Sequence, residues 1–418
     1  MYLQDMHMNK GVFHMSDRRK KQRPRSNRRS NHNRQPKPRY SLFAGRPTYI
    51  DYQFILAVFF LISFGLIMLY SASAYSGVQK FDTDMFYFGG QLKMTIVGIV
   101  AMIFVSKIEY HQFGIYSKWI YLLSIFLMFL VRTPLGDTRY GARRWLKIPG
   151  TGKTIQPSEA AKIAIIVFTA YLICYAIKKI SKSKGFIPIM VMAGFTGLCV
   201  RFFTDNLSTA IIVMGIPFVM LFVAYPDWRP FARCFILAAI LGVIAVILAL
   251  NTADGEGSFR LIRILTWLDQ EKYSGEGGYQ VLQGLYAIGS GGFWGKGLGN
   301  STQKLGVIPE VQNDMILSII CEELGIFGVL LILALFGYLI YRMVYIAQNA
   351  PDLFGTLIVV GVIAHIAIQV ILNIAVVTNF IPTTGITLPF FSFGGTSIVF
   401  LLMEIGMVMG VARKIKIQ

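Results

Sequence analysis

Residues 54–70 of the chain read Phe-Ile-Leu-Ala-Val-Phe-Phe-Leu-Ile-Ser-Phe-Gly-Leu-Ile-Met-Leu-Tyr, a run without a single charged side chain. A bilayer span needs about 20 predominantly apolar residues, so this run with its flanks is long enough to cross a membrane. Residues 160–177 and 235–250 are apolar in the same way, with at most one charged residue each. One soluble core would not account for so many such windows, and the sequence therefore predicts an all-α membrane protein.

The composition of the whole chain agrees with a protein solvated by lipid. Of its 418 residues 55% are apolar and 15% are charged, and the mean hydropathy is +0.57. Soluble domains have about 45–50% apolar and about 25% charged residues. We predict a polytopic protein with about ten transmembrane helices. The predicted spans are 50–71, 92–106, 117–131, 159–177, 187–203, 209–225, 232–250, 315–342, 354–378 and 396–412.

Basic residues set the predicted orientation of these spans. Loops rich in Lys and Arg stay on the cytoplasmic side of a membrane. The short loops predicted to be cytoplasmic carry such residues, and the C-terminal segment 413–416 reads Arg-Lys-Ile-Lys. Both termini are therefore predicted to be cytoplasmic. Residues 50–418 are predicted to form one ten-helix membrane domain, with 251–311 as a large extracellular loop.

Residues 1–49 form a basic tail ahead of the first span. They hold 13 Lys and Arg against two Asp, which supplies +11 of the net charge of +19. Such a polar segment buries too little apolar surface to fold, so we predict a disordered cytoplasmic tail that contacts anionic lipid. Docking of a specific partner is an alternative. Nucleic-acid binding is disfavoured because the tail is attached to a membrane domain.

The loop 132–156 lies on the predicted outer side and breaks the charge rule. An anionic ligand would hold a basic cluster there, because Arg suits bidentate contacts with phosphate. The alternative is that the predicted topology is wrong by one span, which would put this loop on the cytoplasmic side. Against Asp137 alone, the loop carries Arg132, Arg139, Arg143, Arg144, Lys147 and Lys153.

Two carboxylate regions stand at predicted membrane depth, where ionisable groups are costly and often functional. Gln156-Pro157-Ser158-Glu159 opens a span, and Lys162 follows on the same helical face. This pair is either a structural ion pair or part of a polar cavity wall. Asp314 is predicted to stand in the first turn of a later span at the outer interface. It is either an N-cap or a general base facing a water-filled cavity.

Two glycine-rich segments flank these carboxylates. Residues 289–300 are not a Walker A loop, and they predict either a turn near a pyrophosphate or a structural turn. Residues 381–397, rich in Pro and Gly, predict a re-entrant segment beside a cavity or an ordinary surface loop. Residues 279–288 can form an amphipathic helix at the membrane surface. His365, Gln369 and Asn373 recur every four residues, and bundle packing explains that polar stripe.

Taken in order, these motifs resemble the SEDS family (shape, elongation, division and sporulation), the FtsW/RodA/SpoVE group, over residues 50–418. The chain is most similar to the division-type FtsW branch. The resemblance rests on Gly-Ala-Arg-Arg-Trp at 141–145, Gln-Pro-Ser-Glu at 156–159, Asn-Leu-Ser-Thr-Ala at 206–210, Gly-Tyr-Gln at 278–280, Gly-Lys-Gly-Leu-Gly-Asn-Ser at 295–301, Pro-Glu at 309–310 with Asp314, and Leu-Pro-Phe-Phe-Ser-Phe-Gly-Gly at 388–395.

The resemblance implies a peptidoglycan glycosyltransferase that polymerises lipid II into β-1,4 glycan strands at the outer face of the bacterial cytoplasmic membrane, with the division septum as the expected site. Asp314 matches the family's essential acid and would be the general base of an inverting transfer. The family often has His-Thr before this Asp, where the chain has Gln312-Asn313. The predicted diphosphate-binding residues are Arg143, Arg144, Lys162, Lys296 and Lys304. The predicted supporting residues are Gln156, Glu159, Glu310 and Ser392.

The resemblance implies no certain cofactor and no protein metal site, and leaves a divalent cation, Mg²⁺ or Mn²⁺, as an option. Its implied partners are lipid II (an undecaprenyl diphosphate-linked disaccharide peptide), a class B penicillin-binding protein transpeptidase, and other division or elongation proteins. A lipid II flippase using Glu159, Lys162 and His365 is the alternative function, and a non-catalytic scaffold is a third. The enzyme is favoured because the polar motifs gather on the outer side, whereas transporter sites lie near the midplane.

Overall fold

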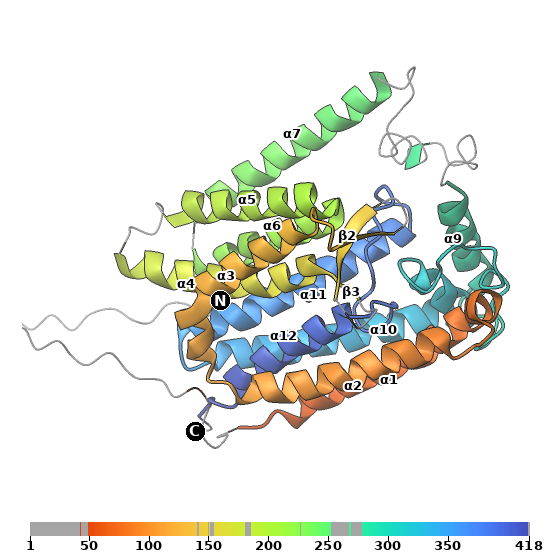
Figure 1. Ribbon diagram of the computed structural model, residues 1–418, viewed down its shortest axis with the longest axis horizontal. Coiled ribbons are helices and arrows are strands. Elements are labelled where there is room, and N and C mark those ends of the chain that lie inside the picture. Colours follow the sequence, from red (N-terminus) through yellow and green to blue (C-terminus); the bar gives the residue numbers. More distant parts are fainter. Residues whose placement is uncertain are drawn as a thin grey trace, which may run out of the picture. The chain divides into compact units, whose positions relative to one another are not determined.

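The computed structural model describes residues 42, 49–139, 142–148, 150, 154–179, 185–225, 227–251, 267–268 and 278–416. The chain divides into two units, residues 1–39 and 40–418, and every described residue belongs to the second. The tail predicted over residues 1–49 therefore lies outside the described residues, apart from Leu42 and Tyr49. The elements are α1 (Tyr52–Phe81), α2 (Phe86–Lys107), α3 (Tyr110–Leu130), β1 (Gly136–Arg139), β2 (Ala142–Lys147), β3 (Thr154–Ile155), α4 (Pro157–Lys179), α5 (Phe186–Thr204), α6 (Leu207–Ala224), α7 (Arg229–Asn251), α9 (Gly278–Gly291), α10 (Ile316–Gln348), α11 (Leu353–Val377) and α12 (Ser397–Ala412) (Figure 1).

Each of the ten predicted spans coincides with one long helix, so the predicted fold class is confirmed. Eight of the described helices are long and apolar enough to cross a bilayer, namely α1 to α6, α10 and α11. The other two predicted spans, 232–250 and 396–412, coincide with α7 and with the 16-residue apolar helix α12. The chain is a multi-pass membrane protein, and its orientation across the bilayer stays a prediction.

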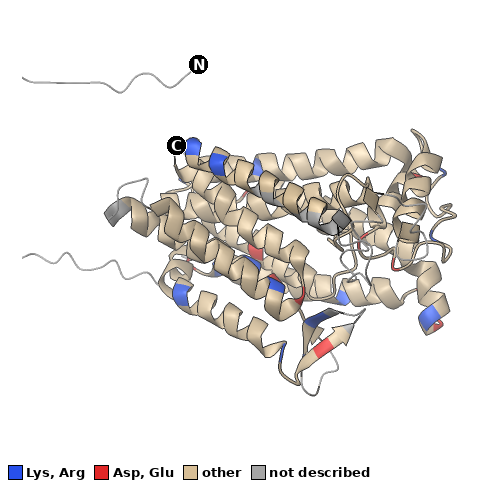
Figure 2. Cartoon of the chain, turned by 90° about the horizontal axis from the view of Figure 1, so that it is seen from above, with Lys and Arg blue, Asp and Glu red and all other residues tan. Residues whose placement is uncertain are grey.

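The outer faces of these helices confirm that lipid is their solvent. Large apolar side chains point away from the bundle, as Phe59, Val100 and Leu123 do with more than half of their surface exposed. Figure 2 shows long stretches of helix with neither acidic nor basic residues. In water such surfaces would aggregate, whereas in hydrocarbon they carry no penalty because the solvent is itself apolar.

Polar side chains fix where several helices begin. The carboxylate of Asp51 accepts a hydrogen bond from Phe54 N (2.9 Å) at the start of α1, and Asn206 Oδ1 accepts from Thr209 N (3.0 Å) at the start of α6. These N-caps satisfy amide groups that the first helical turn leaves without a partner. Helix α10 is interrupted at Gly325, whose φ of 68° only glycine adopts readily.

Helix α11 lies at the centre of the bundle, in contact with α4, α6, α10 and α12. The polar stripe predicted on it, His365, Gln369 and Asn373, is buried. Around α11, α12 packs on α2, α3 packs on α4, and α5 packs on α6. A central helix that carries buried amides and an imidazole must satisfy them with partners from neighbouring segments. Those partners define the candidate site.

The loop between α3 and α4 contains a small sheet that the sequence did not predict. Strands β1, β2 and β3 pair antiparallel in that order, with Gly136 opposite Leu146 and an irregularity between Asp137 and Thr138. Lys147 forms an ion pair with Asp137 across the sheet (3.3 Å). The sheet gives part of the basic loop 132–156 a defined backbone, and it places Arg143 and Arg144 next to each other on β2. Lys153 of this loop lies outside the described residues.

The predicted amphipathic helix at 279–288 is confirmed as α9, which packs on α10 and α11. The rest of the large loop is described only at 267–268 and 292–311. Its last part joins the 381–396 segment, because Phe393 N donates to Gln312 O (2.8 Å). These two irregular segments therefore meet at one end of the bundle.

Candidate active site

Asp314 stands where these two irregular segments meet. It is half-buried and lies two residues before α10 begins, so it is not in the first helical turn as predicted. The N-cap position belongs to Met315, which makes no side-chain capping bond. Gln280 of α9 donates from Nε2 to Asp314 Oδ1 (3.2 Å) and to Pro309 O (3.1 Å). The carboxylate is thus oriented by a side chain rather than used as a helix cap.

The backbone of Asp314 is held from the opposite side by α11. Asn373 Nδ2 donates to Asp314 O (3.1 Å) and to Ile386 O (2.7 Å). Gly385 precedes Ile386, with a φ of 69°, and a Cβ placed there would lie 3.7 Å from Asp314 Oδ2. Glycine at this position leaves the space beside that carboxylate oxygen open.

Glu310 supports the turn that leads to Asp314. Its φ of 49° is unusual for a residue with a side chain. Glu310 Oε2 accepts from Gln312 Nε2 and Asn313 Nδ2, both at 3.0 Å, while Oε1 forms an ion pair with Lys80 of α1. The Gln312-Asn313 pair that replaces the family's His-Thr therefore serves to brace this turn. The supporting role of Glu310 stays a prediction.

Arg143 and Arg144 anchor the small sheet to the bundle. Arg143 donates from Nη2 to Thr133 O, and Arg144 donates from Nη2 to Asp205 O (3.4 Å). Asp205 precedes the N-cap of α6, and in the first turn of that helix Ser208 donates to Thr384 O. Thr384 adjoins Gly385, so the turn that Arg144 contacts at Asp205 leads into the helix that holds this short segment.

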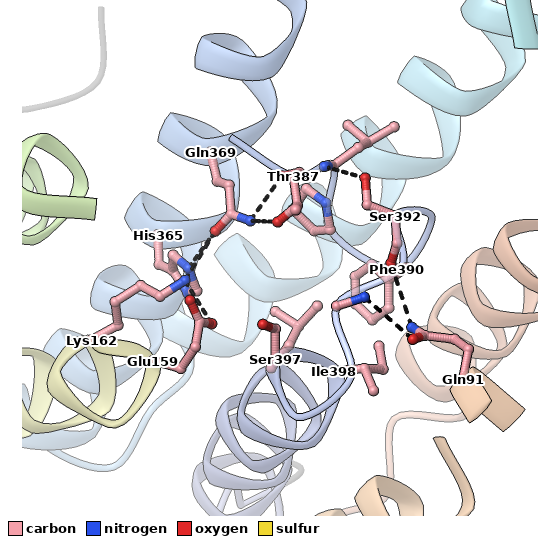
Figure 3. A pocket seen from close by; sticks show the side chains of 14 residues that line it. Gln91, Glu159, Lys162, His365, Gln369, Thr387, Phe390, Ser392, Ser397 and Ile398 are labelled. Atoms are coloured by element: carbon pink, nitrogen blue, oxygen red, sulfur yellow. Dashed lines mark hydrogen bonds and ion pairs between the residues drawn. The ribbon is translucent and has the colours of Figure 1, made fainter. Parts of the chain in front are cut away.

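Glu159 and Lys162 form a buried ion pair in the membrane domain, with Nζ 2.9 Å from Oε2. Lys162 Nζ also donates to Gln369 Oε1 (3.2 Å), which lies 2.8 Å from His365 Nε2. Gln369 Nε2 in turn donates to Thr387 O (2.9 Å) (Figure 3). The pair is therefore both an ion pair and part of a polar cavity wall, so both alternatives left open by the sequence are present.

The cavity beside this pair has a free volume of about 20 Å³, room for about one water molecule. Ser392 closes it from the 381–396 segment, and its Oγ accepts from Leu388 N (2.8 Å). Gln91 of α2 donates to Ser392 O (3.5 Å) and accepts from Gly394 N (3.4 Å) (Figure 3). The segment 381–397 thus lines a cavity inside the bundle, as the re-entrant alternative requires. Of the other supporting residues, Gln156 donates to Ser158 Oγ (3.1 Å).

Lys296 and Lys304 each pair with a buried glutamate of α10. Lys296 Nζ lies 2.6 Å from Glu322 Oε1, and Lys304 Nζ lies 2.6 Å from Glu323 Oε1. The glycine-rich turn is also bonded to α10 through its backbone, where Lys296 N donates to Glu322 O (2.9 Å). Residues 289–300 are therefore fastened to α10, and a role of this turn near a pyrophosphate stays a prediction. The further donors to the Glu322 carboxylate are Ser290, Ser301, Thr302 and Gln303.

A larger apolar groove of about 500 Å³ lies beside Lys304. It is bounded by α1, by the start of α2 and by residues 298–305. Within the described part of the chain, no group of three or more His, Cys, Asp or Glu side chains could hold a metal ion. One carboxylate together with substrate phosphates can bind Mg²⁺, so a cation at the diphosphate stays a prediction and no step below depends on it.

The family model for FtsW, RodA and SpoVE, described as "Cell cycle protein", matches residues 52–417. The chain belongs to this family. Stage V sporulation protein E of Bacillus subtilis (strain 168) is 38% identical to this family member over 366 residues, 87% of this chain and 97% of that protein. A probable peptidoglycan glycosyltransferase FtsW of Trichlorobacter lovleyi is 35% identical, covering 88% of this chain and 94% of that protein.

Two solved structures show the same fold as this family member. One is a chain described under "Structural coordination of polymerization and crosslinking by a peptidoglycan synthase complex", with a TM-score of 0.69, 24% identity, and coverage of 88% of this chain and 99% of that chain. The other is rod shape determining protein RodA of Thermus thermophilus, with a TM-score of 0.61, 23% identity, and coverage of 88% and 98%. At these identities the likeness concerns the fold alone.

The structure of this family member brings seven of the predicted residues together in three places, whereas Arg143, Arg144 and Gln156 lie apart from these groups. Asp314 and Glu310 lie in one turn, Lys162, Glu159 and Ser392 line the small cavity, and Lys296 and Lys304 bind glutamates of α10. Sequence reasoning did not assign a role to the amides that orient the first two groups. Each of these amides had a signal in the sequence. Gln91 is a lone amide early in an apolar span, Gln280 belongs to the Gly-Tyr-Gln motif, and Gln369 and Asn373 belong to the polar stripe.

Proposed function

We propose that the chain is a peptidoglycan glycosyltransferase that polymerises lipid II into β-1,4 glycan strands at the outer face of the membrane. Relatives with 35% identity along almost their whole length carry the name of that activity. The observation that carries the proposal is the carboxylate of Asp314, held by Gln280 and with open space beside Oδ2 at Gly385. A general base needs this combination of fixed orientation and access.

In the proposed reaction, Asp314 accepts the proton of the acceptor's 4-hydroxyl as that oxygen attacks the anomeric carbon of the donor. The bond from oxygen to the anomeric carbon forms while the bond from that carbon to the diphosphate breaks. The diphosphate leaves with the bonding electron pair. Attack opposite the leaving group converts an α-linked donor into a β-linkage, which is an inverting outcome.

The departing diphosphate needs positive charge. We assign this role first to Arg143, which donates to Thr133 O after the end of α3, and to Arg144, which donates to Asp205 O beside the start of α6. Arg is suited to such a group because its guanidinium can donate two parallel hydrogen bonds. Lys296 and Lys304 each neutralise a buried glutamate, so they would have to leave that partner to bind substrate. Lys162 is buried and paired with Glu159.

We further propose that a class B penicillin-binding protein is the partner that cross-links the product. A chain of the same fold comes from a complex described as coordinating polymerization and crosslinking. Localisation at the division septum follows from the likeness to FtsW, and other division or elongation proteins would assemble with it there. The likeness to stage V sporulation protein E leaves a sporulation role open as well.

The test is polymerisation of lipid II by the purified protein, alone and with its transpeptidase partner. Asp314→Asn keeps the shape of the side chain and removes the base, so the rate should fall by about 10²–10⁴-fold. Asp82→Asn is the matched control, because Asp82 is an exposed residue in the left-handed conformation that Asn also adopts. An Asp314→Asn protein with the rate of the wild type would refute the role of Asp314.

The same preparation separates the enzyme from the other two functions. Lipid II translocation across vesicles without glycan formation would support a flippase in place of the enzyme. If the protein shows neither activity but still forms a complex with the transpeptidase, a scaffold is supported. The buried Glu159–Lys162 pair and His365 give the flippase its only structural support among the described residues, and the cavity beside them is too small for a lipid headgroup.

A further inference from the structure

Asn373 is a fully buried amide on the central helix α11, and its two donor bonds run to different segments. One goes to Asp314 O (3.1 Å) and the other to Ile386 O (2.7 Å). Both acceptors are backbone carbonyls, so only the NH₂ group of the amide can face them and the orientation of Asn373 is determined. This single side chain fastens the backbone that carries Asp314 to the 381–396 segment.

The bond to Ile386 places the neighbouring glycine. Gly385 faces Asp314 Oδ2, and its missing side chain leaves the space beside that oxygen open. One helical turn earlier on α11, Gln369 holds the next residue of the segment by donating to Thr387 O (2.9 Å). Two amides of one helix face therefore hold the backbone at Ile386 and Thr387, directly after the glycine that faces the carboxylate.

The arrangement is costly for the fold. Asn373 Oδ1 is buried and has no hydrogen-bond partner among the described residues. A buried acceptor without a partner is unfavourable. Groups that cost stability are commonly retained where a particular geometry is required. Here the geometry concerned is that of the residue with the proposed catalytic carboxylate.

We propose that Asn373 is a positioning residue for Asp314, which sets the distance between the general base and the acceptor hydroxyl without touching substrate. The proposal rests on the proposed function for the role of Asp314, but the clamp itself is a property of the fold. Gln369 is the second member of the clamp and is oriented in turn by Lys162 and His365. The polar stripe of α11 thus serves the site as well as the packing of the bundle.

The variant that tests this is Asn373→Leu, which removes both donor bonds together with the unpartnered oxygen. A misplacement of about 1 Å can cost about 10²-fold in rate. We expect kcat for lipid II polymerisation to fall by about 10–100-fold, with KM changed by less than about threefold, because Asn373 does not contact substrate. The control is Thr356→Val on the same helix, which removes hydroxyl bonds to Ala347 O and Asp352 O (3.1 Å each).

A second measurement separates positioning from general damage. If Asn373 acts through Asp314, Asn373→Leu should cause no further loss in an Asp314→Asn background, because the base it positions is already gone. If the double variant is slower than Asp314→Asn by the same factor by which Asn373→Leu slows the wild type, the proposal is overturned. An unchanged kcat in the single variant would overturn it as well.

Backbone hydrogen exchange tests the clamp independently of activity. Exchange over residues 310–316 and 383–388 should be faster in Asn373→Leu and unchanged in Thr356→Val. Unchanged exchange in Asn373→Leu would overturn the clamp even in an active enzyme. If the wild type does not polymerise lipid II but Asn373→Leu still shows faster exchange, the clamp is supported and the proposed function is refuted. The failure of the clamp and the failure of the proposed function are therefore distinguishable.

Discussion

Lys304 Nζ lies 2.6 Å from Glu323 Oε1, and both side chains are buried where the loop after α9 meets α10. Ser71 of α1 completes this contact, because its hydroxyl donates to the Glu323 carboxylate and lies 3.1 Å from Lys304 Nζ. The ion pair therefore joins three segments that are distant in sequence. The geometry assigns Lys304 a structural partner, whereas the sequence predicted a role on the diphosphate.

This contact predicts the effect of Lys304→Met. Loss of the ammonium leaves Glu323 as a buried carboxylate without its ion pair, and breaking a buried pair costs about 3–5 kcal/mol. The free energy of unfolding of the purified variant, measured in detergent, should be lower than that of the wild type by that amount. The double variant Lys304→Met/Glu323→Gln should recover most of it, because no unpaired charge remains.

Lipid II polymerisation by the double variant decides between the two roles of Lys304. A rate near that of the wild type indicates that the lysine is structural. A stable double variant that does not polymerise lipid II would show that Lys304 also acts on the substrate. A single variant as stable as the wild type would contradict the expected cost of the buried charge.

The ten spans could be predicted because their signal is local. An apolar run of the right length specifies a helix in lipid whatever surrounds it, and Asp51 and Asn206 add caps that are readable from neighbouring residues. The helix at 279–288 was predictable for the same reason. The three-stranded sheet was not, since β2 is rich in Arg and Lys and none of the three short strands has the alternation of apolar and polar residues that marks a typical strand.

The site was predictable in its residue types and not in their partners. The sequence singled out Asp314, Glu159 and Lys162 because charge at membrane depth is rare. It could not show that Lys296 and Lys304 would pair with glutamates of α10, because such pairs depend on how an irregular loop folds back. The amides of α11 were attributed to packing, since nothing local indicates that Asn373 reaches Asp314.

Gln280→Ala tests the amide that orients the proposed base. Gln280 donates to the Asp314 carboxylate (3.2 Å), and a hydrogen bond to a charged group contributes about 1.5–3 kcal/mol. If that bond holds the base in its reactive orientation, the rate of lipid II polymerisation should fall by about tenfold or more. Gln283→Ala is the matched control on the same helix and should leave the rate unchanged. Equal rates for the two variants would show that α9 does not orient Asp314.

A cluster at the other end of the bundle carries the pH dependence that the structure predicts. The side chain of Asp352 caps α11 by accepting from Gly355 N (2.7 Å), lies 2.6 Å from His111 Nε2 and accepts from Tyr110 OH (2.9 Å). Burial by itself would raise the pKa of Asp352, but the bonds from His111, the Gly355 amide and Tyr110 outweigh it and hold that pKa below its ordinary value.

Asp352→Asn separates the charge of this cluster from its cap, because Asn is an N-cap as good as Asp. A carboxylate whose pKa is lowered in the folded state adds stability above its unfolded pKa of about 3.9, and that stability is lost as the pH falls through the lowered value. The unfolding temperature of the variant should therefore lie a few degrees below that of the wild type at pH 7. This gap between the two unfolding temperatures should narrow once the pH drops below about 4. Asp82→Asn, at an exposed position, should show no gap at either pH. A gap for Asp352→Asn that is as wide at pH 3 as at pH 7 would mean that the charge of Asp352 does not hold these helices together.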